Sequence, residues 1–364
     1  MAGELEKEFS QNNSSSDVVY SKCSNCGSNL VFDPQTQCLK CEHCGFLSDF
    51  EKSSAVSELA IEEAFLKAEN WDDEAESYRC ENCGAVVVLA RGETATVCPY
   101  CSTSHVVKTE ELVGLKPNVV YPFTLTNEQG VESAKKWAKK QLFAPRKFKK
   151  SLTANNIRSI YEPCFTFDSK TFSSYNGRVG YRRTRTVGSG KNRRTETYIV
   201  WRNVSGTYSL NFDDIMINAG TTYSQKTLDK LLPFNYNTIK VYEKRFLTGY
   251  TARRYEKPIE DAWADAKNTM DAKIRSAIIS SYHCDVVSYL NVSTTHSAVT
   301  YKYALLPVHI LSFRYRKKDY GVCVNGNTGK VAGKTPISPI RVTIAVLLGL
   351  AVIIGLGYLI YTNL

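Results

Sequence analysis

The sequence lacks the short motifs that mark the common enzyme active sites. It has no HExxH metalloprotease motif and no GxSxG nucleophile motif, and its five histidines are scattered. The segment 326–335 (GNTGKVAGKT) resembles a phosphate-binding loop, but Thr328 stands where that loop requires its first glycine. We therefore expect a protein that is not an enzyme and has no small-molecule substrate. A hydrolase with an unrecognised site is the minor alternative.

Basic residues are scarce in the first third of the chain, and acidic residues are scarce in the rest. Residues 1–112 contain 8 Lys and Arg against 20 Asp and Glu, whereas residues 113–364 contain 38 against 16. The polar residues 1–17 have nothing to bury and are predicted to be disordered, and they contain no apolar stretch of the kind a secretory signal needs. The basic remainder predicts contact with anionic lipid or another polyanion, or simply a soluble surface.

Charge is absent from the last apolar stretch, Val342–Tyr361. A helix of about twenty residues crosses the ~30 Å hydrocarbon core of a bilayer, so residues 340–362 are predicted to form a transmembrane helix; a buried soluble helix is the alternative. Lys330, Lys334 and Arg341 precede the run. Because basic residues stay on the cytoplasmic side, we expect a single-pass tail anchor in the cell membrane with the N-terminal bulk in the cytoplasm.

Cysteine is concentrated in residues 23–101, which hold nine of the twelve. Most form CxxC pairs, which in a reducing cytoplasm favour metal binding over disulfides. Two sets of paired cysteines have the same spacing between their pairs, 27–40 in the first and 84–97 in the second, which predicts two zinc ribbons (18–50 and 77–110) and two Zn²⁺ ions. The predicted ligands are Cys23, Cys26, Cys41 and Cys44 in the first ribbon, and Cys80, Cys83, Cys98 and Cys101 in the second.

An additional cysteine, Cys38, gives the first set a second way of pairing. The matched spacing of the two sets favours the pair at 41 and 44, leaving Cys38 on a strand and His43 beside a knuckle, although either remains an alternative ligand. Gly27 and Gly45 follow the two pairs and are predicted to adopt a positive φ. Four thiolates leave no open coordination position, so the ribbons are expected to be structural or to bind a partner. An iron centre of rubredoxin type is the alternative metal site.

Between and after the ribbons, the pattern predicts an acidic helical linker (51–76) and a basic α+β domain with an antiparallel sheet (111–335). Thr126–Gln141, which begins with a capping box, and Pro258–Tyr282 have helical periodicity. Strand-like runs are Ile160–Phe167, Phe172–Tyr181, Thr195–Tyr208, Val286–Val292, Val299–Leu306, Val308–Arg316 and Tyr320–Asn325. The residues His309, Cys164, Cys284 and Cys323 lie in apolar runs and are predicted to be core residues rather than chemical groups.

Acidic residues are also missing from the strongly basic stretch 178–194. A turn at Gly188–Gly190 divides this stretch, which predicts a long hairpin with a cationic tip. Its basic residues are Arg178, Arg182, Arg183, Arg185, Lys191, Arg193 and Arg194. Interleaved aromatic residues favour nucleic acid. Beside a membrane, anionic lipid or an acidic partner fits equally well, and a hairpin that is only solvated is the remaining alternative.

Several of these features occur together in a known family. The paired CxxCG…CxxC sets, the basic body, the segment 306–315 (LPVHILSFRY) running into 320–331 (YGVCVNGNTGKV) and the terminal apolar helix resemble the bacterial TFIIB-type zinc-ribbon membrane proteins, mostly of Gram-positive organisms. The resemblance implies zinc binding, a membrane location and the assembly of proteins at the envelope, including phage-shock or SPFH-type stress partners. The primosomal or helicase-like label often given to such proteins is not supported, because no ATPase motif is present. The extra Cys38, and Ser102 in place of glycine after the last pair, depart from the pattern.

The sequence therefore predicts two small β zinc ribbons, a basic α+β domain and one C-terminal transmembrane helix. The expected function is that of a tail-anchored, zinc-binding membrane scaffold or adaptor that faces the cytoplasm and assembles partner proteins at the cell envelope. Its expected partners are proteins and the membrane with its anionic lipid surface. The alternative is a membrane-tethered nucleic-acid-binding protein that uses the ribbons and the cationic hairpin.

Overall fold

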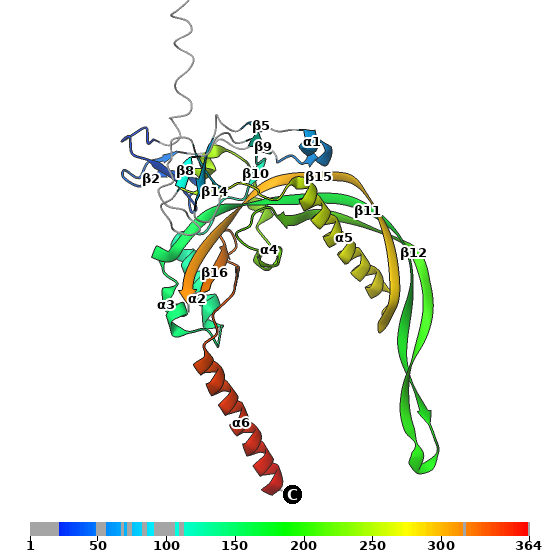
Figure 1. The fold of residues 1–364 in the computed structure, drawn as a ribbon. Coiled ribbons are helices and arrows are strands. Elements are labelled where there is room, and N and C mark those ends of the chain that lie inside the picture. The colour runs from blue at the N-terminus through cyan, green and yellow to red at the C-terminus, as the bar shows by residue number, and fades with distance from the viewer. Residues whose placement is uncertain are drawn as a thin grey trace, which may run out of the picture.

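A long, curved and mostly antiparallel sheet forms an arch that organises the rest of the chain (Figure 1). The computed structural model describes residues 22–48, 56–66, 69–70, 75–81, 86–90, 106–108, 113–315 and 318–362. Most of the arch consists of β11 (Ile157–Val187), β12 (Arg194–Asn218) and β15 (Val286–Tyr315). Strand β11 lies between the other two and pairs antiparallel with both, so the sheet closes half of a barrel.

The strands of the arch are longer than the sequence pattern predicts. The runs Ile160–Phe167 and Phe172–Tyr181 belong to one 31-residue strand, because the polar stretch between them is a bulge at Asp168–Ser169 and not a turn. A bulge bends a strand and increases its twist, which fits the curvature of the arch. Pro163 and Pro307 lie inside β11 and β15, since the fixed φ of proline is compatible with extended backbone.

Helix α5 (Ile259–Ser281) lies under the concave face of the arch (Figure 1). Pro258 precedes its first turn, which carries acidic residues as the helix dipole favours. Its buried residues recur three to four positions apart and include Met270, Ile274 and Ile278, which join the largest hydrophobic cluster with aromatic residues of β11. Full burial of such a side chain contributes about 1.5–3 kcal/mol, so this face holds the helix against the sheet. The predicted helix is confirmed.

A second helical layer, α2 (Asn127–Lys139) and α3 (Arg146–Ser151), covers the other end of the arch. The predicted capping box is present: the Gln129 N–H donates to Thr126 Oγ1, and the Thr126 N–H donates to Gln129 Oε1. Phe148 of α3 packs on Phe313 of β15 with 5.5 Å between ring centroids. These contacts, together with the apolar face of α2, form a separate small core.

Shorter elements complete the sheet and its flanks. They are β4 (Leu59–Ala60), α1 (Ile61–Leu66), β5 (Glu69–Asn70), β9 (Val113–Gly114), β10 (Val119–Val120), α4 (Gln225–Leu231), β13 (Lys240–Val241), β14 (Thr251–Arg253), β16 (Lys318–Asn325), β17 (Val331–Gly333) and 3-10 turns at Ala154–Asn156, Gly190–Asn192, Tyr236–Thr238 and Lys244–Leu247. Strand β16 extends the sheet beside β15 and pairs with β17. The pairing of β10 with β15 and of β11 with β14 is parallel.

The N-terminal part forms two small strand groups beside the arch. Strands β1 (Leu30–Asp33), β2 (Cys38–Cys41) and β3 (Leu47–Ser48) make a three-stranded antiparallel sheet. Phe32 of β1 is buried against Phe246 and Tyr250, so this sheet shares the main core. The second group, β6 (Ala75–Cys80), β7 (Val86–Ala90) and β8 (Val106–Lys108), joins the large sheet through pairing of β7 with β14.

Helix α6 (Pro339–Thr362) leaves the arch below α2 and α3 (Figure 1). Residues Pro339–Ile360 are long and apolar enough to cross a membrane, and that window is not buried against the rest of the protein. Large side chains such as Ile353, Ile354 and Leu356 are exposed along it. Among the described residues, nothing packs around this window, and its length and apolar composition are those of a membrane-spanning helix.

Candidate metal centre

Four cysteines converge beside the first small sheet. The Sγ atoms of Cys23, Cys26, Cys41 and Cys44 all lie within 4.8 Å of one another. The Sγ atoms of Cys23 and Cys44 are 3.5 Å apart, as are those of Cys26 and Cys41, and none of the four forms a disulfide. Thiolates about 2.3 Å from one metal ion, in tetrahedral array, are separated by nearly this distance. The arrangement could therefore hold a metal ion with four sulfur ligands.

Two matching turns position these thiols. In the first, the N–H of Gly27 donates to the carbonyl of Cys23 at 2.8 Å, and in the second, the N–H of Gly45 donates to Cys41 at 2.9 Å. Gly27 and Gly45 have φ values of 74° and 75°, which confirms the predicted positive φ. A residue with a side chain would be strained there, so each turn needs glycine directly after its CxxC pair.

Local hydrogen bonds favour the thiolate form of the two exposed cysteines. Hydrogen bonds from Ser28 lower the pKa of the Cys26 thiol to about 5. The backbone N–H of Phe46 lowers the pKa of Cys44 in the same way. The deprotonated thiol is the form that binds a metal, so these bonds favour the metal-binding state at Cys26 and Cys44. At Cys41, the backbone bond of Cys44 is outweighed by burial and by the hydrogen bond with the Cys26 thiol, which raise the pKa to about 11. The other two cysteines, Cys23 and Cys41, are buried.

Cys38 and His43, the two alternative ligands of the first set, lie outside the group of four thiols. Cys38 lies on β2, and its Sγ donates to the carbonyl of Thr36 at 3.3 Å. His43 is exposed within the second turn. Neither belongs to the group of four thiols.

The second set of cysteines is described only at its start. Cys80 ends β6 and is buried, whereas Cys83, Cys98 and Cys101 lie outside the described residues. The pairing around it repeats that of the first set: Lys22 pairs with Asn29, and Arg79 pairs with Val86. Each of these pairs begins at the residue just before the first cysteine of its set and ends three positions after the second. The described residues on either side of the first CxxC therefore pair in the same register in both sets.

The cationic hairpin is the distal end of β11 and β12. Strand β15 accompanies β11 only as far as Gly180, so the following residues form a two-stranded ribbon (Figure 1). Gly188 and Gly190 have φ values of 91° and 60° at its tip, which confirms the predicted turn. Arg182, Arg183, Arg193 and Arg194 have exposed side chains there, and Lys191 lies in the connecting turn.

Two of the hairpin arginines contact aromatic rings of the opposite strand. The guanidinium of Arg178 lies 5.5 Å from the Trp201 ring centroid, and that of Arg185 lies 5.6 Å from Tyr198. Arg185 also forms an exposed ion pair of 2.9 Å with Glu196. Because neighbouring residues on a strand point to opposite faces, the basic side chains are divided between both faces of the ribbon.

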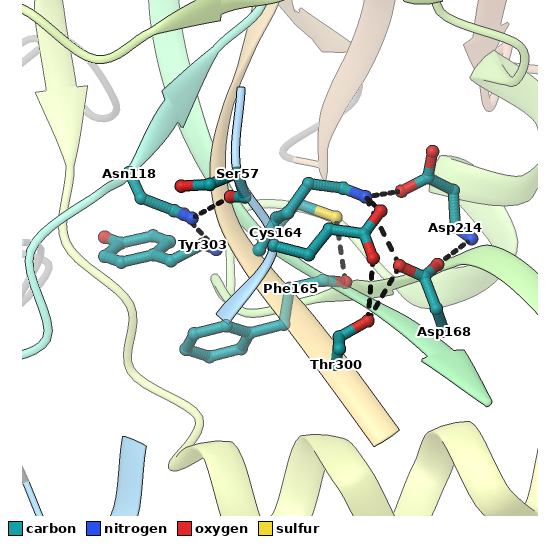
Figure 2. A network of polar contacts seen from close by, with 10 residues as sticks. Ser57, Asn118, Cys164, Phe165, Asp168, Asp214, Thr300 and Tyr303 are labelled. Atoms are coloured by element: carbon teal, nitrogen blue, oxygen red, sulfur yellow. Dashed lines mark hydrogen bonds and ion pairs between the residues drawn. The ribbon is translucent and has the colours of Figure 1, made fainter. Parts of the chain in front are cut away.

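A buried lysine that the sequence did not indicate forms the centre of a polar network. The Lys302 ammonium is 3.4 Å from Asp168 and 2.9 Å from Asp214. Figure 2 shows Asp168, Asp214 and Thr300 in this network, where the Thr300 hydroxyl donates to Asp168 at 3.2 Å. Glu58 completes the network at 2.8 Å from Lys302. Burial raises the pKa of Asp168 to about 6, whereas the hydrogen bond from Lys302 lowers the pKa of Glu58. The single positive charge of Lys302 is thus shared by three carboxylates, and its contact with Glu58 ties residue 58 to the sheet.

His309 is a core residue, as expected. It is fully buried on β15, its Nδ1 lies 2.6 Å from Ser159 Oγ, and its ring packs on Phe123. Burial lowers its pKa to about 4, so the imidazole is neutral at physiological pH. Burial also raises the pKa values of the Cys164 and Cys323 thiols, which are therefore unreactive core groups.

Comparison with known proteins identifies a relative over nearly the full length. The chain is 31% identical over 328 residues to the uncharacterized protein YdjG of Bacillus subtilis, an alignment that covers 88% of this chain and 91% of YdjG. No protein-family model matches the chain, and no solved structure matches it.

Proposed function

The chain belongs to the family of the Bacillus subtilis protein YdjG, and from the arrangement of its cysteines and of α6 we propose that it is a zinc-binding membrane scaffold or adaptor. Helix α6 anchors it, and the arch and the cysteine sheets face the cytoplasm. The two metal centres stabilise small sheets that present surface to partner proteins at the envelope. This function is not enzymatic.

The observation that carries the proposal is the closed set of four thiols. A catalytic zinc keeps one coordination position for water or substrate, whereas four cysteines fill a tetrahedral site. Zinc is the preferred metal for such a site, and an iron centre is the alternative. The identical register around Cys80 supports a second centre with Cys83, Cys98 and Cys101.

The anchor and its orientation follow from charge. Lys330, Lys334 and Arg341 lie on the arch side of α6. Basic residues flanking a membrane helix remain in the cytoplasm. The first cysteine sheet is fixed to the arch by Phe32, so a partner bound there is held at a defined place above the membrane.

Metal content and partner capture test the proposal together. The purified full chain is expected to contain two zinc ions by elemental analysis, and Cys→Ser replacement of all four cysteines in either set is expected to remove one. The matched control is Cys38→Ser, which removes a nearby thiol outside the group and should keep both ions.

Crosslinking in membranes should then capture defined proteins that are lost with the quadruple variants. A full zinc content in both quadruple variants would refute the metal centres, and unchanged capture would refute the adaptor role.

The cationic ribbon supports a second function, binding of nucleic acid. A two-stranded β-ribbon fits the DNA major groove, and basic side chains on both of its faces suit contact with two phosphate backbones. This function predicts an affinity for DNA or RNA that falls steeply with salt and depends on Arg182, Arg183, Arg193 and Arg194. Nucleic acid enriched in place of proteins in the capture experiment would favour it over the adaptor role.

A further inference from the structure

The turn between α2 and α3 carries exposed apolar residues next to the beginning of α6. Leu142 and Phe143 are 75% and 43% exposed, and Ile340 in the first turn of α6 is 71% exposed. Two hydrogen bonds join the segments: the Ser338 N–H donates to the Phe143 carbonyl at 2.8 Å, and Arg341 Nη1 donates to the Leu142 carbonyl at 2.9 Å. The apolar turn and the start of α6 are thus held together below the arch (Figure 1).

The bond from Arg341 sets the depth of this turn relative to a bilayer. Arg341 is the last charged residue before the uncharged run of α6. In a helix that spans the membrane, as the proposed function requires, the guanidinium stays at the level of the lipid headgroups. Leu142 and Phe143 must then lie at about the same level. Exposed apolar side chains at this level gain free energy by entering the boundary between headgroups and acyl chains.

The helices on both sides of the turn are basic. From Ser133 to Tyr161 the chain contains nine Lys and Arg and no acidic residue. Seven of these basic side chains are exposed: Lys135, Lys136, Lys139, Lys140, Arg146, Lys147 and Lys150. A cluster of roughly four to eight basic residues on the cytoplasmic side of a membrane helix is typical of binding to anionic lipid headgroups.

We propose that residues 135–150 form a membrane-interface platform. Leu142 and Phe143 insert into the headgroup region of an anionic bilayer beside α6, and the surrounding lysines bind lipid phosphates. The platform rests on the proposed membrane anchor and identifies its lipid-binding surface at the α6 end of the arch. Two fixed points, α6 and the turn, then restrict how the arch tilts over the membrane.

Photocrosslinking of the full-length protein in lipid nanodiscs tests this proposal. The photoreactive residue p-benzoylphenylalanine is incorporated in place of Phe143, in place of Leu348 within α6, or in place of Phe172, which is exposed on the arch. Mass spectrometry after illumination should detect lipid adducts at the first two positions but not at Phe172. In discs containing phosphatidylglycerol, the adduct at Phe143 should exceed that in pure phosphatidylcholine by about tenfold, whereas the adduct at Leu348 should not change.

Charge variants identify which basic cluster is responsible. Replacing Lys139, Lys140, Lys147 and Lys150 by Gln should remove the phosphatidylglycerol-dependent increase at Phe143. The matched control replaces Arg182, Arg183, Arg193 and Arg194 by Gln, which removes the same charge from the hairpin and should leave the increase intact. Far-UV circular dichroism and zinc content verify that both variants remain folded.

The other outcomes overturn the proposal in distinguishable ways. Lipid adducts at Leu348 without any at Phe143 would retain the anchor and refute the platform. Crosslinking of Phe143 to a second protein chain would show that the turn docks a protein. Equal adducts in both lipids, or loss only in the hairpin variant, would refute binding of anionic lipid by these lysines. Absence of adducts at Leu348 as well would refute the membrane anchor itself.

Discussion

Replacing Lys302 by Met is expected to destabilise the arch strongly, because it removes the cation shared by three carboxylates. The Lys302 side chain is 6% exposed and lies 2.8–3.4 Å from Glu58, Asp168 and Asp214. The Glu58 side chain is 42% exposed and can turn to water, whereas those of Asp168 and Asp214 are 13% and 15% exposed and cannot. Removing one partner of a buried ion pair costs about 3–5 kcal/mol.

The magnitude is measurable by thermal unfolding. For a domain of roughly 150–250 residues, 1 kcal/mol corresponds to about 2–4 °C, so Tm should fall by about 6–20 °C. Far-UV circular dichroism of the full chain in detergent follows the transition. The matched control is Lys170→Met, which removes an exposed lysine from neighbouring β11 and should leave Tm nearly unchanged.

The pH dependence distinguishes lost charge compensation from lost packing. The raised pKa of Asp168, about 6, means that the folded state binds a proton more tightly than the unfolded chain, whose Asp titrates near 3.9. Stability from this group is therefore greatest at low pH and is lost as pH rises through the folded pKa. Removal of Lys302 raises that pKa further, so the deficit of the variant should shrink from pH 7.5 to pH 5. A deficit that is constant with pH, or a Tm within about 2 °C of the native protein, would refute the reasoning.

Three further results are expected. Burial lowers the pKa of His309 to about 4, so its contribution to stability is fully present above pH 6.5 and is lost, up to about 3 kcal/mol, as pH falls through 4. The variant His309→Phe should lack this loss of stability at acid pH, which denaturant unfolding at several pH values measures. Gly326→Ala should destabilise by about 1–3 kcal/mol, since its Cβ would meet the buried Phe123 ring, whereas Gly321→Ala, with open space, should not. Gly27→Ala should weaken zinc retention against a chelator, because φ there is 74° and strains any residue with a Cβ; retention equal to the native protein would contradict this.

The first group of four cysteines shows how much can be predicted from sequence alone. The spacing between CxxC pairs, repeated in the two sets, selected four of the five cysteines in the first set, and the same four thiols are the ones that the fold gathers. The spacing is informative because two CxxC pairs can reach one ion only through short turns, whose geometry depends on neighbouring residues alone. The second set remains a prediction at Cys83, Cys98 and Cys101, which lie outside the described residues.

The long strands show what the sequence alone does not predict. The polar stretch around Asp168 looked like a break between two strands, yet it is a bulge held by pairing with residues 212–216 and 297–301, far along the chain. A local pattern cannot distinguish a turn from a bulge, because the decision belongs to the partner strands. The same holds for Pro163 and Pro307, which lie within strands that continue on both sides of them.

The sequence by itself determined the features that depend on neighbours within a few turns of chain. These are the CxxC turns with their glycines, the capping box of α2, the apolar face of α5, the tip of the cationic hairpin and the uncharged length of α6. Only the tertiary structure decided which distant groups meet. Glu58 and Lys302 are 244 residues apart in sequence, and Leu142 and Arg341 are 199 apart. Such contacts carry no local signature, because their free energy appears only after the arch has brought both segments to the same place.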